Sequence, residues 1–183
     1  MSTETTRGTV TRGETDDRAA WTLTPLAEEE RPLQMRLVEL HLHDLSEVAG
    51  RDVGDDGRFV ETDSYDRYGA GAGHHALLLQ VAGRPAGFVL VDERGLLPRG
   101  DDRRFVAEFF VVRAHRSRGV GSAVARAVFD RYPGRWQVLQ MAENTAAQTF
   151  WRRVVSAYTG GRYAERWMPN GDIVQAFDTA DKA

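Results

Sequence analysis

The chain has 183 residues, no cysteine and a formal net charge of −3 at pH 7. Its length suits one domain with a sizeable core, and the lack of cysteine excludes disulfides, thiolate nucleophiles and cysteine-based zinc sites. The near balance of acidic and basic residues gives no electrostatic case for nucleic acid or an anionic membrane as a partner.

No apolar run approaches the roughly 18 residues that a membrane helix needs, and the N-terminus lacks the basic-then-apolar plan of a signal peptide. We therefore expect a cytoplasmic location. Residues 1–20 contain almost no apolar side chains, so they cannot bury enough surface to offset the entropy of ordering. The sequence predicts a disordered tail over 1–20 and a folded domain over 21–180.

The first predicted elements are a short strand and an amphipathic helix. Residues 21–24 alternate between apolar and polar side chains and predict the strand. Residues 28–48 predict the helix, whose apolar residues cover a wide arc. His41 projects into this arc and Asp44 lies at its edge. The segment 50–75 is rich in glycine and aspartate and is expected to be irregular.

The remaining elements complete an α/β pattern. Strands are predicted at 76–81, 86–91, 105–112, 136–141, 162–167 and 173–177, and helices at 122–131 and 145–158. The first two of these strands form an antiparallel hairpin, and the nearly all-apolar 105–112 fits a central strand covered on both faces. The order predicts an α/β domain with a mixed central sheet of about six to seven strands flanked by helices.

A glycine pair stands between a buried strand and a helix start, in Arg116-Ser-Arg-Gly-Val-Gly121. Backbone N–H groups at a helix N-terminus are free donors, and glycines let an anion approach them, so the segment predicts a site for a phosphate ester. A dinucleotide-binding site would require a third glycine at the position of Val124, and a P-loop would require a lysine, so the segment fits neither. Coenzyme A fits, because its pyrophosphate needs only a short cradle. A tight turn that binds nothing is the alternative.

The pattern Arg116-x-x-Gly119-x-Gly121 resembles the R/Q-x-x-G-x-G/A motif of the GNAT (general N-acetyltransferase) superfamily. The resemblance covers residues 21–178, with the same order of elements. Stretches such as "GRPAGFVLV" and "FWRRV" are similar to a bacterial subgroup of predicted acetyltransferases. The resemblance implies one GNAT-like domain whose sheet opens in a V-shaped split at the central strand.

For binding, the resemblance implies acetyl-CoA as the acyl donor, used without a metal. The pyrophosphate would lie on the N–H groups of 117–122, the pantetheine arm would pair with the backbone of 109–111, and Asn144 would contact the pantetheine or the substrate. The implied cofactor-binding residues are Phe109, Phe110, Val111, Arg116, Ser117, Arg118, Gly119, Val120, Gly121, Ser122, Asn144, Ala147, Phe150 and Trp151. Expected partners are a small-molecule amine and, because dimers are common among similar proteins, a second copy of the chain.

For catalysis, amine acetylation needs a base that removes a proton from the amine. Glu108 is the first candidate, because it is the one charge within 105–112 and a carboxylate among apolar neighbours holds a proton more readily than in water. Similar proteins carry acids at this place or one residue away, which would reverse the face; here the neighbour is Ala107. The alternative is a structural carboxylate paired with an arginine. His41 and Asp44 are the second candidates, as acceptor-site residues, against the alternative of a buried core histidine.

The general acid is where the sequence departs from the family. The residue after Phe150 is usually a tyrosine that acts as the acid, whereas here it is Trp151, whose indole N–H does not donate a proton at useful pH. Tyr158 or Tyr163 is the candidate replacement, against the alternative that Tyr158 is a core aromatic. A thiolate whose pKa is near 8.5 leaves without much help.

The sequence thus predicts an acetyl-CoA-dependent N-acetyltransferase that moves an acetyl group to the primary amine of a small molecule by direct attack in a ternary complex. Three alternatives stay open. One is an acyl-CoA-binding or regulatory module without turnover, and another is an enzyme that acts on a peptide or protein amine. The third is acyl transfer from another donor or to a hydroxyl acceptor.

Overall fold

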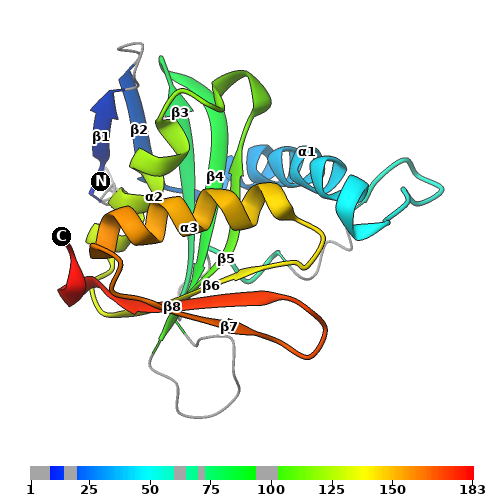
Figure 1. Cartoon of the computed structure of the whole chain (residues 1–183). Helices are drawn as coiled ribbons and strands as arrows, with labels where there is room; N and C mark the ends of the chain where they lie inside the picture. The colour runs from blue at the N-terminus through cyan, green and yellow to red at the C-terminus, as the bar shows by residue number, and fades with distance from the viewer. Residues whose placement is uncertain (1–8, 15–19, 60–64, 70–72, 94–102) are drawn as a thin grey trace.

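An eight-stranded mixed sheet runs through the computed structural model, which describes residues 9–14, 20–59, 65–69, 73–93 and 103–183 (Figure 1). The strands are β1 (Thr11–Glu14), β2 (Ala20–Pro25), β3 (His74–Val81), β4 (Arg84–Asp92), β5 (Arg104–Val111), β6 (Arg135–Gln140), β7 (Ala164–Trp167) and β8 (Ile173–Asp178). Their order across the sheet is β1-β2-β3-β4-β5-β6-β8-β7. The predicted α/β class is confirmed, with one strand more than expected.

The additional strand is β1, and the prediction of a disordered tail is wrong for residues 11–14. This segment pairs antiparallel with β2, from Thr11 opposite Leu23 to Glu14 opposite Ala20. A Cβ on Gly13 would lie 2.5 Å from the Trp21 ring, so glycine is needed for the backbone to pack directly against that indole. A polar segment is ordered here because a neighbouring strand supplies its hydrogen bonds. Residues 1–8 and 15–19 of the predicted tail lie outside the described residues.

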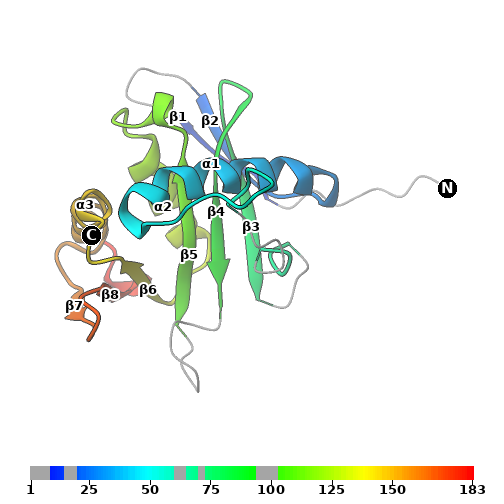
Figure 2. The same cartoon turned by 90° about the vertical axis from the view of Figure 1, so that its right-hand side faces the viewer.

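Helices cover both faces of the sheet. They are α1 (Arg31–Ala49), α2 (Val120–Arg131) and α3 (Thr145–Thr159), with short 3₁₀ turns η1 (Glu28–Glu30), η3 (Arg113–His115) and η4 (Thr179–Asp181). α1 packs on one face, in a cluster with β3, β4 and β5, whereas α2 and α3 pack on the other (Figure 2). Pro32 stands in the first turn of α1, where a missing N–H costs nothing. The predicted helices agree with these bounds to within a few residues.

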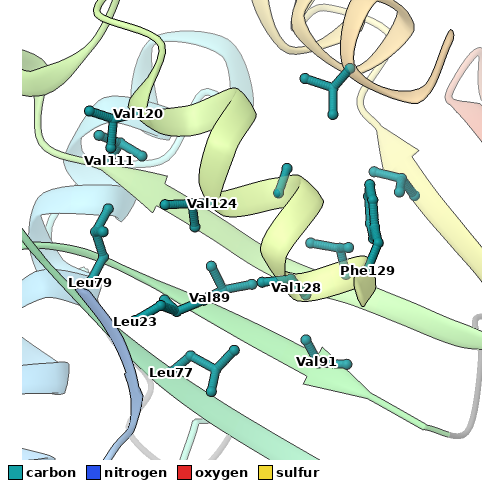
Figure 3. Packing of buried hydrophobic residues seen from close by; sticks show 14 of the residues in the cluster. Leu23, Leu77, Leu79, Val89, Val91, Val111, Val120, Val124, Val128 and Phe129 are labelled. Atoms are coloured by element: carbon teal, nitrogen blue, oxygen red, sulfur yellow. The ribbon is translucent and has the colours of Figure 1, made fainter. Parts of the chain in front are cut away.

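The core beneath α2 fixes where that helix begins. Val120, Val124 and Val128 recur every four residues, so they lie on one stripe of the helix, beside Phe129. Figure 3 shows this stripe packed on side chains of the sheet, among them Leu79. Because Val120 is fully buried as the first helical residue, the N-terminus of α2 is held close to the end of β5.

The sheet splits between β5 and β6, as predicted. The two strands are parallel, and their pairing runs from Arg104 opposite Trp136 to Val106 opposite Val138. Beyond that point β5 continues to Val111 paired with β4, and β6 continues to Gln140 paired with β8. The strands therefore diverge in a V, and the second half of β5 has an open edge.

Candidate active site

The segment after β5 forms a concave turn of backbone N–H groups. Ser117 and Gly119 both have positive φ angles, +60° and +76°. Gly119 caps α2, and the first intrahelical bond joins Ala123 N to Gly119 O at 3.0 Å. The N–H groups of the first helical residues, 120–122, therefore have no intrahelical acceptor. Left-handed residues in a turn that leads into a helix N-terminus, together with the free N–H groups of that terminus, can form an anion-binding site, so these angles are compatible with the predicted phosphate cradle.

Gly121 has a packing role that the sequence did not reveal. A Cβ at this position would lie 3.2 Å from Cε2 of Phe150 and 3.8 Å from Cε1 of Phe109. The missing side chain thus lets α2 approach α3 and β5. The prediction attributed this glycine to close approach by a ligand, whereas the structure shows that it first permits close approach by an aromatic ring.

Arg116 turns its side chain back toward the sheet. Its Nε donates to Val111 O at 2.6 Å, and its guanidinium pairs with Asp44 of α1. Arg113 donates to the other oxygen of Asp44 at 2.8 Å. Burial by itself raises the pKa of the Asp44 carboxyl, but the two guanidiniums outweigh it and hold that pKa below its ordinary value. This pairing favours a structural role for Asp44, joining α1 to the cradle, over contact with an acceptor.

The open edge of β5 offers backbone groups to an extended ligand. Val112 N donates to Ala86 O, and the Phe110 carbonyl faces Gly87, so both residues direct their peptide groups toward β4. Since successive residues of a strand alternate, Phe109 and Val111 direct theirs toward the split. The Val111 carbonyl already accepts from Arg116. The remaining groups suit a strand-like arm that runs from the split to the cradle.

Glu108 lies on the α1 face of β5 and is bonded through both carboxylate oxygens. Oε2 is 2.7 Å from Nε2 of His41, and Oε1 accepts from the Tyr65 hydroxyl at 3.2 Å. The structure therefore brings two separately predicted residues, Glu108 and His41, into direct contact. The hydrogen-bond partners found for Glu108 are thus a histidine and a tyrosine, rather than the arginine that the structural alternative supposed.

A β-bulge places Ala107 on the same face of the sheet as Glu108. Leu90 pairs with Glu108, but the next residue, Val91, pairs with Val106, so Ala107 is an extra residue on β5. In such a bulge two successive side chains turn to the same side. Ala107 accordingly packs in the α1 cluster, as Glu108 does in its contact with His41. The bulge thus places both positions at which similar proteins carry acids on one face.

Tyr65 is the residue of this site that sequence reasoning missed. It lies in the turn 65–69, which packs over the α1 face of the sheet. Burial, and then the negative charge of Glu108, raise the pKa of the Tyr65 hydroxyl far above its ordinary value. The hydroxyl therefore stays protonated and remains a donor at any ordinary pH. No sequence signal joins Tyr65 to Glu108, because 43 residues separate them.

At the start of α3 the predicted residues divide between capping and packing. Asn144 is the N-cap, and its Oδ1 accepts from Ala147 N at 2.9 Å. Phe150 is half-buried beside Gly121. Trp151 is 6% exposed, with its ring among Phe109, Phe129 and Phe150. Phe150 is thus the more exposed of the pair, while Trp151 belongs to the core.

Tyr158 lies two turns further along α3, in the core. Its ring packs on Phe129 and Phe177, and its hydroxyl donates to Asp130 at 2.8 Å. Burial, and then Asp130, raise the pKa of this hydroxyl strongly, which makes it a poorer acid. Lys182 also pairs with Asp130. These contacts favour the core-aromatic alternative over the role of general acid.

Other features of the described residues lie apart from this site. A cavity of about 770 Å³ between β1 and α2 is lined by Trp21, Arg126 and Asp130, among others, and shares no lining residue with the cradle or with Glu108. In the part of the chain that the structure describes, no group of three or more His, Cys, Asp or Glu is arranged to hold a metal ion. Among those same residues, no helix combines the length and apolar character needed to cross a membrane.

Solved structures share this fold. The GNAT domain of PAT from S. lividans superposes with a TM-score of 0.65 and 17% identity, over 92% of this chain and 96% of that one. RimJ of Mycobacterium smegmatis, in complex with CoA-disulfide, gives 0.62 and 13%, over 94% and 88%. The ribosomal-protein-S18-alanine N-acetyltransferase of Escherichia coli gives 0.57 and 14%, over 87% and 94%. At these identities the likeness establishes the shared fold.

A search of curated proteins gives no match. The family model described as "Acetyltransferase (GNAT) family" matches residues 37–155, from the middle of α1 through most of α3. This span includes Glu108 and the whole segment 116–122, and it covers more than half of the chain. The chain therefore belongs to the GNAT family of acetyltransferases.

Proposed function

We propose that the protein transfers the acetyl group of acetyl-CoA directly to the primary amine of a small molecule, within a ternary complex. The observation that carries this proposal is the convergence of three features on β5: the split from β6, the N–H cradle that follows the strand, and Glu108 on the α1 face. A donor held in the split and an amine beside Glu108 would meet at the same strand.

The described residues fit acetyl-CoA, which supplies an activated acetyl group as a thioester when it is bound. The N–H groups of 117–122 would hold the pyrophosphate, and the free edge of Phe109 and Val111 would hold the pantetheine arm. An N–H of this edge would also polarise the thioester carbonyl, as a preorganised donor of the kind that supplies a few kcal/mol to catalysis. Phe150 would border the arm on the α3 side.

Glu108 would act as the base. Its side chain is 26% exposed, so an amine or a bridging water can reach it. An alkyl amine is mostly protonated near neutrality, and the carboxylate would accept the proton that the nitrogen must lose. The chain has no cysteine thiol to carry an acyl group, which supports direct transfer. With Trp151 and Tyr158 both in the core, Tyr163 would be the remaining candidate acid. A thiolate whose pKa is near 8.5 would also leave without much help.

A peptide amine is the second candidate acceptor, because one structural relative is named as an acetyltransferase of a ribosomal-protein alanine. The small-molecule and peptide hypotheses are distinguished by which kind of amine stimulates the release of CoA. A screen of small diamines and aminoglycoside-like amines against short peptides with free N-termini distinguishes them. Higher kcat/KM for a peptide would replace the small-molecule assignment and leave the acetyl-transfer chemistry unchanged.

Calorimetric titration with acetyl-CoA, free CoA and NADH tests the donor site, followed by an assay of thiol release. We expect micromolar binding of acetyl-CoA and none of NADH. Gly119→Ala should weaken this binding, because φ at Gly119 is +76° and an alanine there disfavours the cradle conformation by about 1 kcal/mol or more. Gly161→Ala is the matched control, since its φ is +83° with no neighbour around the added Cβ, at the far end of α3.

Two outcomes would overturn the proposal in different ways. Equal loss of acetyl-CoA binding in Gly119→Ala and Gly161→Ala, or no binding by the wild type, would remove the donor site. Tight binding without thiol release for any amine would instead favour the alternative of an acyl-CoA-binding module.

A further inference from the structure

We propose that His41 and Tyr65 are positioning residues that hold the two carboxylate oxygens of Glu108 and so aim the base at the acceptor. This inference deepens the proposed function and rests on it. Glu108 receives one donor from α1 and one from the turn 65–69, and each donor is bonded to a different oxygen. A carboxylate fixed at both oxygens has one orientation about its terminal torsion, whereas a free glutamate has many.

The exposed fractions of the side chains indicate that Glu108, rather than His41, is accessible to the substrate. The side chain of Glu108 is 26% exposed, whereas that of His41 is 10% exposed. The His41 ring lies against the sheet aromatics, 5.8 Å from the Phe88 ring and 5.4 Å from the Phe110 ring. The histidine is therefore behind the carboxylate. This arrangement favours the alternative of a buried histidine over direct contact of His41 with the acceptor.

The direction of each hydrogen bond follows from the chemistry of the partners. An ionised carboxylate has only acceptors, so Nε2 of His41 must carry the proton and donate it. The Tyr65 hydroxyl, which stays protonated because of its burial and its charged neighbour, donates to the other oxygen. Each oxygen keeps a second lone pair. Glu108 can thus accept a proton from the acceptor while both supporting bonds stay in place.

Other titratable groups interact electrostatically with members of this group of Glu108, His41 and Tyr65. Tyr68, in the same turn as Tyr65, interacts electrostatically with Glu108 and with Asp92 at the end of β4. Arg51, just after α1, acts on Tyr65. The hydrogen bonds found to the Glu108 carboxylate come from His41 and Tyr65. The test below therefore changes the donors alone.

His41→Gln and His41→Leu form a matched pair of variants. Glutamine keeps an N–H donor near the position of Nε2 without a titratable ring, whereas leucine keeps only the apolar packing. In the thiol-release assay we expect kcat to fall between about tenfold and a hundredfold in His41→Leu, as for a misplaced catalytic group. His41→Gln should recover most of kcat. Tyr65→Phe, which removes one oxygen, should lower kcat in the same direction, with the Kd of acetyl-CoA unchanged in all three.

The pH profile gives a readout that a purely structural role would not move. Hydrogen bonds to the ionised form favour that form, so removing a donor should shift the acid limb of the kcat/KM profile to higher pH. We expect this shift in His41→Leu and Tyr65→Phe and its absence in His41→Gln. Full activity in folded His41→Leu, or a deficit in His41→Gln as large as in His41→Leu, would overturn the proposal.

An NMR measurement separates failure of this inference from failure of the proposed function. In protein labelled with ¹⁵N-histidine, the His41 Nε2–H should give a protected downfield proton signal that disappears in Glu108→Leu. If that signal is present but the wild type releases no thiol with any amine, the acetyl-transfer proposal fails. If the wild type turns over but the signal is missing or survives in Glu108→Leu, the positioning proposal fails.

Discussion

The two faces of β5 differ in how they serve the site. On the α1 face, Glu108 forms a polar group with His41 and Tyr65 inside an otherwise apolar cluster. On the α2–α3 face, Phe109 packs against Phe150 and Trp151, with no polar side chain in these ring contacts. The strand β5 thus has a hydrogen-bonded carboxylate on one face and aromatic packing on the other.

The difference shows that the two halves of the proposed reaction depend on different parts of the chain. In the proposed reaction, donor binding would rely on backbone groups at the open edge of β5 and in the cradle, beside the aromatic face. Proton removal would rely on the side chain of Glu108, which β5 carries and which α1 and the turn 65–69 contact. Substitutions on the two faces should therefore separate binding from turnover, and the following predictions are ordered by the size of the expected effect.

Glu108→Gln should have the largest effect. The amide cannot accept a proton at neutral pH, so kcat should fall by about 10²- to 10⁴-fold, the usual contribution of a general base. The Kd of acetyl-CoA, measured by calorimetry, should be unchanged. Glu165→Gln is the matched control, because that carboxylate pairs with Arg152 on α3, away from the site. Unchanged turnover in Glu108→Gln would remove the base assignment.

Gly121→Leu should disturb the packing on the α2–α3 face of β5 and so weaken donor binding. The added side chain meets Phe150, because even a Cβ would lie 3.2 Å from its ring. Overpacking of this kind costs about 1–3 kcal/mol, and a shifted α2 N-terminus should weaken acetyl-CoA binding by about tenfold or more. Titration and thermal unfolding measure both effects, with Gly121→Ala expected to be intermediate. Wild-type affinity in Gly121→Leu would contradict this account of the cradle.

Asp44→Asn should reduce stability in a pH-dependent way. The pKa of Asp44 is lowered in the folded state, so its contribution to stability is present above its unfolded pKa, about 3.9, and is lost as the pH falls through the folded value. At neutral pH the variant should lose about 1–2 kcal/mol, as for a hydrogen bond between charged groups. Once the pH is below the folded pKa of Asp44, the two proteins should converge in stability. Parallel unfolding curves at every pH would argue against the ion pair.

Tyr158→Phe should have the smallest effect, with about 1 kcal/mol of stability lost and no change in kcat. The variant removes only the hydroxyl that donates to Asp130, which keeps its pairing with Lys182. Urea unfolding gives the first quantity and the thiol-release assay the second. A tenfold fall in kcat would restore Tyr158 as the general acid.

The sequence by itself predicted the order of the elements other than β1, and it pointed to the place of the proposed donor site. Periodicity located α1, α2 and α3, since each buries one stripe of side chains, and the spacing from Arg116 to Gly121 marked the turn proposed to hold the pyrophosphate. These features are local, because helix periodicity and glycine geometry depend on residues close together in the chain. Glu108 was also found locally, as a charge within an apolar strand.

The tertiary structure alone decided how those parts meet. β1 is ordered because β2 lies beside it, and Asp44 is an anchor because β5 ends next to α1. Tyr65 and His41 reach Glu108 across 43 and 67 residues of sequence, and the pairing of Glu108 with Leu90 places the carboxylate on their face of the sheet. Contacts of that kind depend on packing and register, which no local pattern of residues encodes.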